Sequence, residues 1–428
     1  MNFQFRHLIY PVRKNCTIVI EPVFPVEVNE KANYALTVYP YSGLRRYGLR
    51  GQNVAPAQAD EAFFGVPHPL NARDGVLELD ASFPQEDCYL CKLLVNGVQT
   101  DALELYALND DLFAKTPFKG DNHMHTWMSD GKDSPMYMAA QSCRRGYDYC
   151  VITDHKKFEP SLIARDFFKT TGVDFLVVPG EEVHSPDNPV HIINLGGNES
   201  VNDWWRDHED EYRAAVEAEL KTMNAPMVER DKYAAAASQV MFDRIRGVDG
   251  VAVLCHPNWI LANGFNESED ITDYLFDHKR FDALELIAGG AYEDGTQMQI
   301  SYYHDRPTMP ILGNSDAHGC FGDKLEPGNY TIVFADALDV DSIKRAIREG
   351  KTVAGNKNKL YGDYRLVKYG YFLLRNYYPQ HKKLRDGLGA WMLRLASSGL
   401  GADSEIAAHL SQPRPSEIFE PLRWCGKE

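Results

Sequence analysis

Five short segments rich in His, Asp and Glu constrain this chain more than any other feature. Each lies at the end of a short apolar run, and in chain order they are GDNHMHTWMSDG (120–131), TDHK (153–156), PGEEVH with HIIN (179–194), LCHPN (254–258) and GNSDAHG (313–319). Strands that end in such side chains deliver them to the mouth of a barrel, where they can share metal ions. The pattern therefore predicts one metal site built from all five segments.

The length and charge of the chain limit its partners. At 428 residues it has room for two or three domains with a buried core. Because 61 Asp and Glu outnumber 45 Lys and Arg, the net charge is −16, which disfavours nucleic acid as a general partner. The N-terminal residues lack the apolar core of a signal peptide, and no stretch approaches the roughly 20 apolar residues of a membrane span. We expect a cytoplasmic protein without membrane association.

The eight cysteines are too few for a disulfide framework in a chain of this length. Most lie in apolar runs, which predicts reduced thiols in the core. Cys88 and Cys91 form a CxxC pair, but their surroundings indicate a strand that would point the two thiols to opposite faces. A metal or redox role for this pair is the less favoured alternative.

The periodicity of apolar residues divides the chain into three parts. Residues 1–117 carry short alternating runs between turns, which is typical of a β-sandwich, and KTPFKGD (115–121) is the expected linker. Residues 118–356 alternate apolar strands with amphipathic helices, which predicts a parallel sheet wrapped by helices. Residues 357–428 are predicted to form a C-terminal helical segment that packs on the barrel.

A charged, Ala-rich and helical stretch, residues 197–247, interrupts the rhythm of the middle part. Its ends lie near His191 and His256 in the sequence, so we expect it to shape or cap a substrate entrance with its acidic helix facing solvent. A helical decoration on the outer wall of the barrel is the alternative.

Two pairs of ligands are the strongest part of the predicted site. Alternation in a strand places residues i and i+2 on one face, so His123 with His125, and Asp316 with His318, can each bind one ion. A single buried His is ordinarily a core residue, but two such pairs followed by polar loops are hard to explain in that way. Asp130 is also predicted as a ligand, although a role as a turn residue is the alternative.

The other predicted ligands come singly. His155 ends an apolar run, and Asp154 before it is expected to orient the imidazole. Glu181 and Glu182 are adjacent, so only one is expected to face inward, where a carboxylate can bridge two cations. His191 and His256 complete the set. Carboxylates mixed with imidazoles, without a thiolate, favour two or three catalytic Zn, Mn or Fe ions.

The ordered motifs HxHT…SDG, TDH, GxE, H, HP and SDAH resemble those of the PHP superfamily, named for polymerase and histidinol phosphatase. The resemblance covers about 118–356 and implies a distorted (β/α)7 barrel. It implies one ion at His123, His125, Glu182 and Asp316, a second at Asp130, His155 and His318, and a third at Glu182, His191 and His256. It also selects Glu182 over Glu181. The sandwich joined through a KGD-type linker is similar to the carbaryl-hydrolase-like branch.

These residues predict a metal-dependent hydrolase. Two ions about 3.5–4 Å apart lower the pKa of a shared water to about 7, which supplies a bridging hydroxide without a Ser or Cys nucleophile. We expect a phosphoesterase that acts on a small phosphorylated molecule, with amide, carbamate or ester hydrolysis as the enzymatic alternative and a non-enzymatic binding protein as the third. The predicted catalytic set is Asp130, Glu182, His256, Lys156 and His184. Lys156 could bind a substrate anion, and His184 could act as an acid or an extra ligand.

Overall fold

The computed structural model describes residues 2–23, 26–43, 63–261, 264–289, 293–305, 309–320 and 328–398. These residues form two compact units. The N-terminal unit contains residues 2–115 and Tyr371–Gln380, and the central unit contains Thr116–Gly370 and residues 381–398. Much of the predicted C-terminal segment, residues 399–428, lies outside the described residues.

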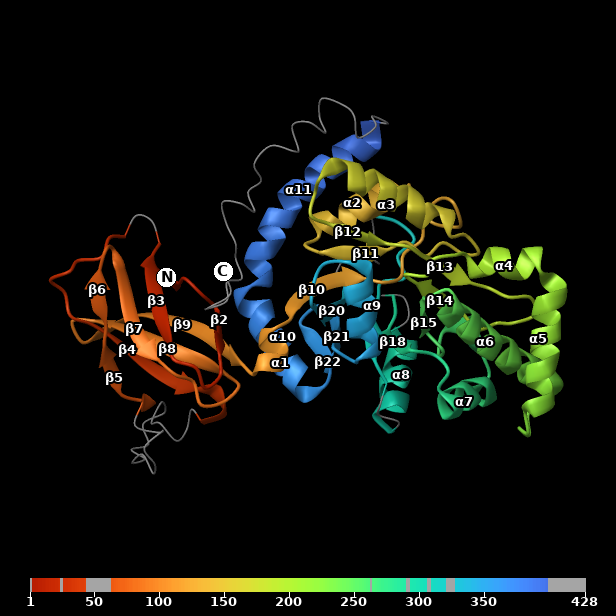
Figure 1. Cartoon of the computed structure of the whole chain (residues 1–428), viewed down its shortest axis with the longest axis horizontal. Helices are drawn as coiled ribbons and strands as arrows, with labels where there is room; N and C mark the ends of the chain where they lie inside the picture. Colours follow the sequence, from red (N-terminus) through yellow and green to blue (C-terminus); the bar gives the residue numbers. More distant parts are fainter. Residues whose placement is uncertain are drawn as a thin grey trace. The chain divides into compact units, whose positions relative to one another are not determined.

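The N-terminal unit is built from two β-sheets (Figure 1). The first sheet has the strand order β1 (Phe3–Phe5), β3 (Cys16–Pro22), β7 (Val76–Ala81) and β6 (Asn71–Arg73). The second has the order β2 (Ile9–Pro11), β9 (Val98–Leu108), β8 (Asp87–Val95), β4 (Tyr34–Pro40) and β5 (Pro67–Pro69). All pairs are antiparallel except β2 with β9. A 3-10 turn, η1 (Tyr41–Gly43), and a short helix, α1 (Asp110–Phe113), complete the unit.

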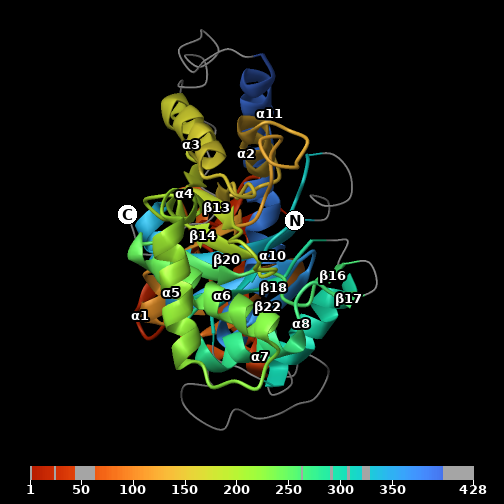
Figure 2. The same ribbon diagram turned by 90° about the vertical axis from the view of Figure 1, so that its right-hand side faces the viewer.

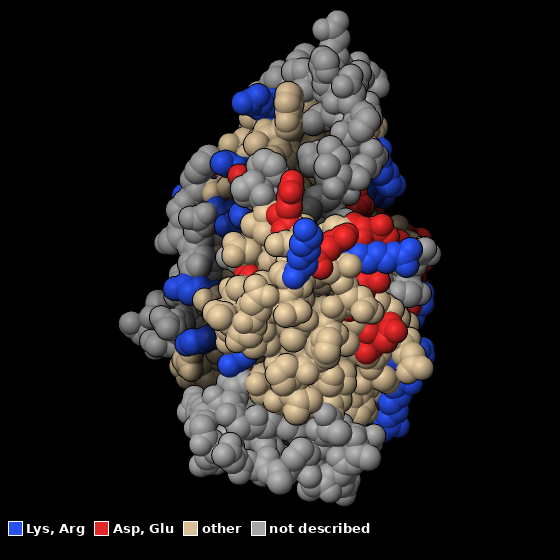
Figure 3. Space-filling view, turned by 90° about the vertical axis from the view of Figure 1, so that its left-hand side faces the viewer, with Lys and Arg blue, Asp and Glu red and all other residues tan. Residues whose placement is uncertain are grey.

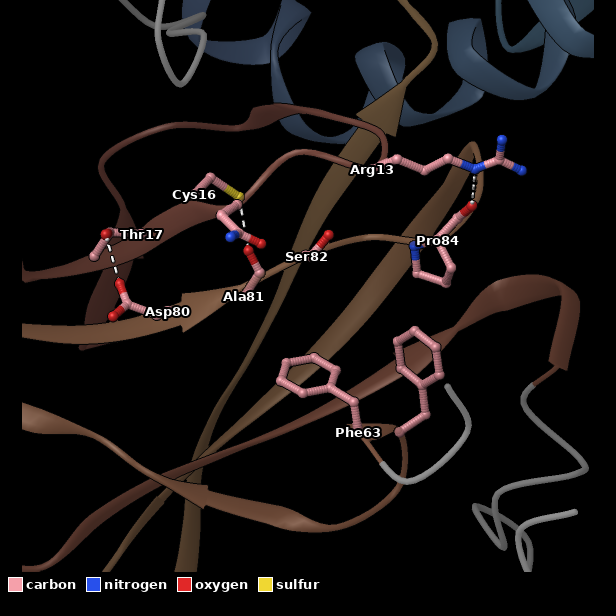
Figure 4. A pocket seen from close by; sticks show the side chains of 10 residues that line it. Arg13, Cys16, Thr17, Phe63, Asp80, Ala81, Ser82 and Pro84 are labelled. Atoms are coloured by element: carbon pink, nitrogen blue, oxygen red, sulfur yellow. Dashed lines mark hydrogen bonds between the residues drawn. The ribbon is translucent and has the colours of Figure 1, made fainter. Parts of the chain in front are cut away.

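Alternate residues of both sheets share one apolar core, which includes Phe5 and Ile20 of the first sheet and Leu36 and Leu105 of the second. Cys88 and Cys91 lie in β8 as buried, free thiols. A cavity of about 1100 Å³ opens beside Phe63, Thr17 and Asp80 (Figure 4). The Thr17 hydroxyl donates to Asp80 at 2.7 Å there. None of the predicted site residues lines this cavity.

The central unit is a mixed α/β structure with two larger sheets. One has the strand order β12 (Leu176–Val178), β11 (Tyr149–Val151), β10 (Thr116–Asp121), β20 (Asn329–Ala335), β21 (Thr352–Asn356) and β22 (Lys359–Gly362). The other has the order β13 (Gly180–Val183), β14 (Ile192–Leu195), β15 (Val251–Leu254), β18 (Ala283–Ile287) and β19 (Ile311–Gly313). A two-stranded hairpin, β16 (Ile260–Leu261) and β17 (Gly264–Phe265), follows β15.

The prediction of a purely parallel sheet is wrong. Strands β10, β11 and β12 are parallel neighbours, as are β15, β18 and β19, but β14 runs antiparallel to both β13 and β15, and β20 runs antiparallel to β10. The reason lies in the β13–β14 connection, which is a short loop without a helix and can join only antiparallel neighbours. Isolated bridges from Met124 to Ala317 and from His155 to Glu182 link the two sheets.

Helices cover these sheets (Figures 1 and 2). In chain order they are α2 (Pro135–Arg144), α3 (Glu159–Thr171), α4 (Val201–Asp207), α5 (Glu209–Thr222), α6 (Glu229–Gly247), α7 (Glu269–His278), α8 (Glu293–Asp305), α9 (Val340–Arg348), α10 (Tyr364–Asn376) and α11 (Tyr378–Ser398). Helices α2 and α3 pack on β11 and β12, and α5, α6 and α7 lie side by side. In the described part of the chain, no helix combines the length and apolar character that a membrane crossing requires.

Side-chain caps fix where several helices begin. The Ser134 hydroxyl accepts from the backbone N–H of Tyr137, and Pro135 stands at the first helical position of α2. The Ser200 hydroxyl accepts from the N–H of Asp203 and so starts α4 at the edge of the predicted site. These local signals set the positions at which the chain leaves each strand.

Helix α6 belongs to the core of the central unit. Its residues Ala234–Ala237 are fully buried in one apolar cluster with Ile192 of β14 and Leu254 of β15. In contrast, the acidic residues at the start of α5, Glu209–Glu211, are exposed. Any capping role of residues 197–247 would therefore fall on α4 and α5, because α6 supports the strands that carry the predicted ligands.

A buried ionic cluster fixes α11 within the central unit. Asp148 Oδ1 lies 2.7 Å from His381 Nε2 and accepts from Arg385 Nη2 at 2.8 Å, while Oδ2 accepts from the backbone N–H of Lys119. Burial alone would raise the pKa of Asp148, but the two basic side chains and the N–H outweigh it and lower the pKa to about 2. The carboxylate is therefore a stabilising anion in the folded state.

The described charged residues do not form one continuous field on the face in Figure 3. Acidic and basic side chains are interspersed there around a broad area of uncharged residues. On this face, therefore, the described side chains offer no large area of a single charge.

Candidate metal centre

Nine predicted ligands converge at one edge of the central unit. Most follow the carboxyl end of a strand: His123 and His125 follow β10, His155 follows β11, His256 follows β15, and Asp316 and His318 follow β19. Glu182 lies within β13. His191 instead precedes β14, and it reaches the same edge because β14 is antiparallel to its neighbours. The antiparallel strand thus adds a ligand that a purely parallel barrel would place at the opposite edge.

Glu182 lies at the middle of the cluster, fully buried. Its Oε2 atom lies 3.4 Å from Nε2 of both His123 and His125, and 2.7 Å from Nδ1 of His155. Its Oε1 atom faces the other way, 2.7 Å from Nδ1 of His191 and 3.8 Å from Nε2 of His256. Each oxygen of this one carboxylate therefore faces its own group of imidazoles.

His123, His125 and Asp316 form the first group of close ligand atoms. Oδ1 of Asp316 lies 3.5 Å from Nε2 of His123 and 3.1 Å from Nε2 of His125. All three residues are buried. The i and i+2 pairing expected from the sequence thus directs both imidazoles toward one point.

A second group combines His125, Asp130, His155 and His318. Oδ2 of Asp130 lies 3.4 Å from Nε2 of His155 and 3.2 Å from Nε2 of His318. The turn that presents Asp130 depends on Gly131, because a Cβ atom there would lie 2.5 Å from the carbonyl oxygen of His125. Asp130 is half-exposed, so this group lies at the open side of the cluster.

The backbone at the site adopts a conformation that side-chain-bearing residues rarely use. Lys156, His256 and Asp316 have φ angles of 59°, 24° and 48°. Such conformations persist where the surrounding structure enforces them, and they concentrate at functional sites. They occur here in or beside three of the five predicted segments.

The sequence did not reveal Glu285, a fully buried carboxylate in β18 that supports the cluster. Its Oε1 atom lies 2.9 Å from Nδ1 of His123 and accepts from Asn314 Nδ2, and its Oε2 atom accepts from the backbone N–H of His256. A Glu in the middle of the apolar run ALELI is a signal that could have identified it. A carboxylate that binds the second nitrogen of a ligating His fixes its ring orientation.

The carboxylates of Asp154 and Glu181, which neighbour predicted ligands in the sequence, fix the backbone around the cluster. Asp154 was expected to orient His155, but its Oδ1 atom accepts from the backbone N–H groups of Thr126 and Ser129, so it fixes the loop that leads to Asp130. Glu181 points away from Glu182 and accepts from the backbone N–H of Val201 at the start of α4. Of the adjacent pair, Glu182 is the carboxylate that lies among the imidazoles.

The charges of the cluster stabilise one another. Burial disfavours charge on Glu182, but His191, His155 and His123 outweigh this effect and hold the pKa of its carboxyl well below the usual range. Burial likewise opposes protonation of His155, yet Glu182 and Asp130 raise its pKa to about 10. The pKa of Asp316 is also lowered, against burial, by His123 and His125. The carboxylates are anionic ligand groups at neutral pH.

Orphaned polar atoms provide a test of whether the cluster fits metal ions. Several buried atoms lie close to one another but form no hydrogen bond of suitable geometry: both oxygens of Glu182, Nε2 of His123, both ring nitrogens of His125 and Nδ1 of His191. Buried polar atoms are ordinarily hydrogen-bonded, so a concentration of unpaired ones needs an explanation. Imidazole and carboxylate donors suit divalent transition metals, and the cluster therefore fits such ions.

The remaining predicted residues surround this cluster. Lys156 is exposed beside His155. Nε2 of His184 lies 2.8 Å from Nδ1 of His155. Among the aromatic residues considered as pocket walls, Trp127 is 64% exposed, which excludes a core position. The ring of Trp259 lies 5.5 Å from the rings of both His191 and His256, so it borders the cluster.

Comparison with known proteins gives partial likenesses. No family model matches the chain. The DNA polymerase/3'-5' exonuclease PolX of Bacillus subtilis (strain 168) is 39% identical over 56 residues, which are 13% of this chain and 10% of that protein. The chain therefore spans about a tenth of the length of this curated relative.

Two solved structures resemble parts of this chain at low similarity. One is a two-domain protein from Bacteroides vulgatus ATCC 8482 that contains a predicted PHP-like metal-dependent phosphoesterase; it has 19% identity and a TM-score of 0.44, covering 60% of this chain and 70% of the other. The other is an amidohydrolase from Chromobacterium violaceum with bound sulfate and no metal, at 18% identity and a TM-score of 0.33, covering 48% and 89%.

Proposed function

We propose that this chain is a metal-dependent hydrolase of the PHP superfamily, acting on a small phosphorylated molecule as a phosphoesterase. One observation carries the proposal: the two oxygens of Glu182 face separate groups of imidazoles, with Oε2 at 3.4 Å from Nε2 of His123 and His125 and Oε1 at 2.7 Å from Nδ1 of His191. A carboxylate in this position can bridge two cations, and a bridged pair is the arrangement used for hydrolysis of esters by water.

In this proposal the chain holds three ions, and Glu182 is a ligand of two of them. His123, His125, Glu182 and Asp316 would hold the first, Asp130, His155 and His318 the second, and Glu182, His191 and His256 the third. When bound, Zn, Mn or Fe ions would lower the pKa of a coordinated water and neutralise charge on the attacked and leaving oxygens.

The chain's own residues would place the substrate. Asp130 and His318 lie at the open side of the cluster, where a substrate enters. Lys156 is exposed next to His155, and its ammonium group would bind a substrate phosphate there. Helix α4 borders the same segment, because Arg206 donates to the carbonyl oxygen of Lys156. The Asp154 contacts with the 126–129 loop keep the entrance residues in position.

The finer features expected from the sequence belong to the same proposal. They comprise a (β/α)7 barrel, an N-terminal sandwich as in the carbaryl-hydrolase-like branch, the domain boundaries at 117 and 356, a cytoplasmic location and no nucleic-acid partner. Amide, carbamate or ester hydrolysis at the same cluster is the second candidate, because water activated by bound metal ions could attack any of these carbonyl groups. A binding protein without activity is the third candidate, but a barrel that had lost its activity should also have lost ligands, and all nine predicted ligands are present.

A substrate panel tests the proposal. The full chain, reconstituted separately with Zn, Mn and Fe, is assayed against aryl and alkyl phosphate monoesters, aryl carbamates, amides and carboxylic esters. We expect the wild-type protein to hydrolyse phosphate monoesters. A chelator should abolish this activity, and the Asp316→Ala variant should lack it. Carbamate or amide hydrolysis without phosphatase activity would reverse the ranking of the two candidates.

A further inference from the structure

We propose that His184 is a metal ligand, so that the ion on the Oε1 side of Glu182 is held by three imidazoles and one carboxylate. This inference rests on the proposed function, since it concerns one ion of the same centre. It adds a protein ligand to the nine that the sequence motifs supply, and it changes the kind of ion that this position binds.

The position of His184 relative to Glu182 supports the proposal. Its Nε2 atom lies 3.6 Å from Oε1 of Glu182, beside the 2.7 Å approach of His191 and the 3.8 Å approach of His256. Ligand atoms of a tetrahedral zinc site lie about 3.3 Å apart, given metal–ligand bonds of about 2.0–2.1 Å. Three imidazole nitrogens therefore lie within 4 Å of one carboxylate oxygen.

The rings form a continuous arc. The ring centroid of His184 lies 4.2 Å from that of His191, and the centroids of His191 and His256 lie 5.0 Å apart. Nδ1 of His191 and Oε1 of Glu182 are buried and lie 2.7 Å apart, but neither forms a hydrogen bond of suitable geometry. An ion at this position would satisfy both atoms, which is the independent sign that a ligand belongs here.

The backbone at His184 is fixed for this role. Its N–H donates to Oδ1 of Asn202, and Nδ2 of the same Asn202 donates to the carbonyl oxygen of Glu182. Asn202 is fully buried in α4, whose first turn is bound by Glu181. Helix α4 therefore holds the end of β13 so that Glu182 and His184 lie on the cluster.

The ligand set has a chemical consequence. Three imidazoles with one carboxylate oxygen form a four-ligand set that suits zinc, and a site closed by four protein ligands leaves no open position for water. We therefore infer that this ion is a resident zinc that is bound more tightly than its neighbours. Its function would be to neutralise the charge of Glu182, and the water of the proposed hydrolysis would be bound by the ions on the Oε2 side.

The competing explanation is that His184 serves only His155. Nε2 of His184 lies 2.8 Å from Nδ1 of His155, close enough for a hydrogen bond. In that case, loss of His184 would weaken the ion at Asp130, His155 and His318 instead. The two explanations assign His184 to different ions, so metal binding by paired variants separates them.

Zinc affinity of the full chain is measured by competition with a chromophoric chelator. The proteins compared are the wild type, the single variants His184→Ser, His191→Ala and His318→Ala, and two double variants that combine His184→Ser with His191→Ala or with His318→Ala. His304→Ser, at an exposed position on α8, is the matched control. We expect His184→Ser to weaken one zinc by about 100-fold or more, beyond the roughly 10–100-fold effect of residues that only orient a ligand. Because His184 and His191 would bind the same ion, the double variant of these two residues should lose no more zinc than His191→Ala alone. The double variant of His184 and His318 should lose two zinc ions, because these residues would bind different ions.

Two outcomes would overturn the proposal: zinc affinities in His184→Ser that match those of His304→Ser, or a double variant in which His184→Ser adds nothing to His318→Ala. If His184→Ser does not fold, His184→Asp retains a ligand oxygen and should retain the zinc, and loss of that zinc from folded His184→Asp also contradicts the proposal. The readout is independent of hydrolysis. Wild-type protein that binds zinc but cleaves no substrate would refute the proposed function and leave this inference intact.

Discussion

Oε1 of Glu285 lies 2.9 Å from Nδ1 of His123, and this contact links a strand that bears no predicted ligand to the centre of the cluster. With Nδ1 engaged by Glu285, Nε2 of His123 faces Glu182 and Asp316 at 3.4 and 3.5 Å. Glu285 also receives the backbone N–H of His256. One buried carboxylate therefore orients two of the predicted ligand segments.

Substitution Glu285→Gln should lower metal affinity about 10–100-fold. The carboxylate accepts at both oxygens, from His123 and Asn314 at Oε1 and from His256 at Oε2, and a Gln would turn a donor toward one of them. Isothermal titration with zinc measures the change, with Glu217→Gln on the exposed face of α5 as control. If Glu285→Gln and Glu217→Gln bind zinc with equal affinity, Glu285 does not position the metal ligands.

The substitutions His125→Ala and Asp316→Ala should each remove one ion and nearly all turnover. Both side chains are buried, and their ligand atoms lie 3.1 Å apart at the point that His123 also faces. Metal content and hydrolysis are measured on the same preparations, with folding checked by circular dichroism. Activity retained in either variant would count heavily against the site.

The cation beside the cluster can be tested by kinetics. If Lys156 binds the substrate phosphate, Lys156→Ala should raise KM and leave metal content unchanged, because the side chain is exposed and a protonated amine does not bind a metal ion. Lys169→Ala, an exposed Lys on α3, is the control. A KM equal to that of the control would return Lys156 to the role of a solvated loop residue.

The stability of the central unit should depend on Asp148 at low pH. The pKa of Asp148 is lowered to about 2 in the folded chain, from an ordinary value of 3.8, so its contribution is present above pH 4 and is lost as the pH falls toward 2. This difference corresponds to roughly 2 kcal/mol in the free energy of unfolding. At pH 7 the free energy of unfolding of Asp148→Asn should be lower than that of the wild type by at least this amount. At pH 3 the difference between the two proteins should be smaller. Urea unfolding at both pH values measures it, and a pH-independent difference would contradict the account.

The candidate ligands could be named from the sequence because an HxH or DxH pair at the end of an apolar run is a local signal. The structure brings His123 and His125 together with Asp316, as alternation predicts for the two histidines. The expected pairing of Asp316 with His318 at one ion is not found, because His318 groups with Asp130 and His155 and because Asp316, with φ 48°, is not in extended backbone. Glu182 could be chosen over Glu181 only by resemblance. The helix cap that occupies Glu181 is a tertiary contact with Val201.

The features that the sequence did not predict depend on contacts between segments that are distant in the chain. Glu285 resembles an ordinary strand residue until β18 lies beside β15 and its carboxylate meets His256 and His123. The direction of β14 is set by a loop too short for a crossover, which the apolar pattern of HIINL does not encode. Helix α6 was predicted as part of an insertion because its length was unusual, yet its Ala-rich face packs on β14 and β15.

The central claim is that the chain holds a multinuclear metal centre. Elemental analysis by mass spectrometry of the purified full chain, after reconstitution with Zn, Mn or Fe and removal of free ions, tests it most directly. Nine predicted ligands exceed the roughly three to four protein ligands that one catalytic ion takes, so the account predicts at least two ions per chain with one of these metals. One ion or none per chain with every metal would contradict it.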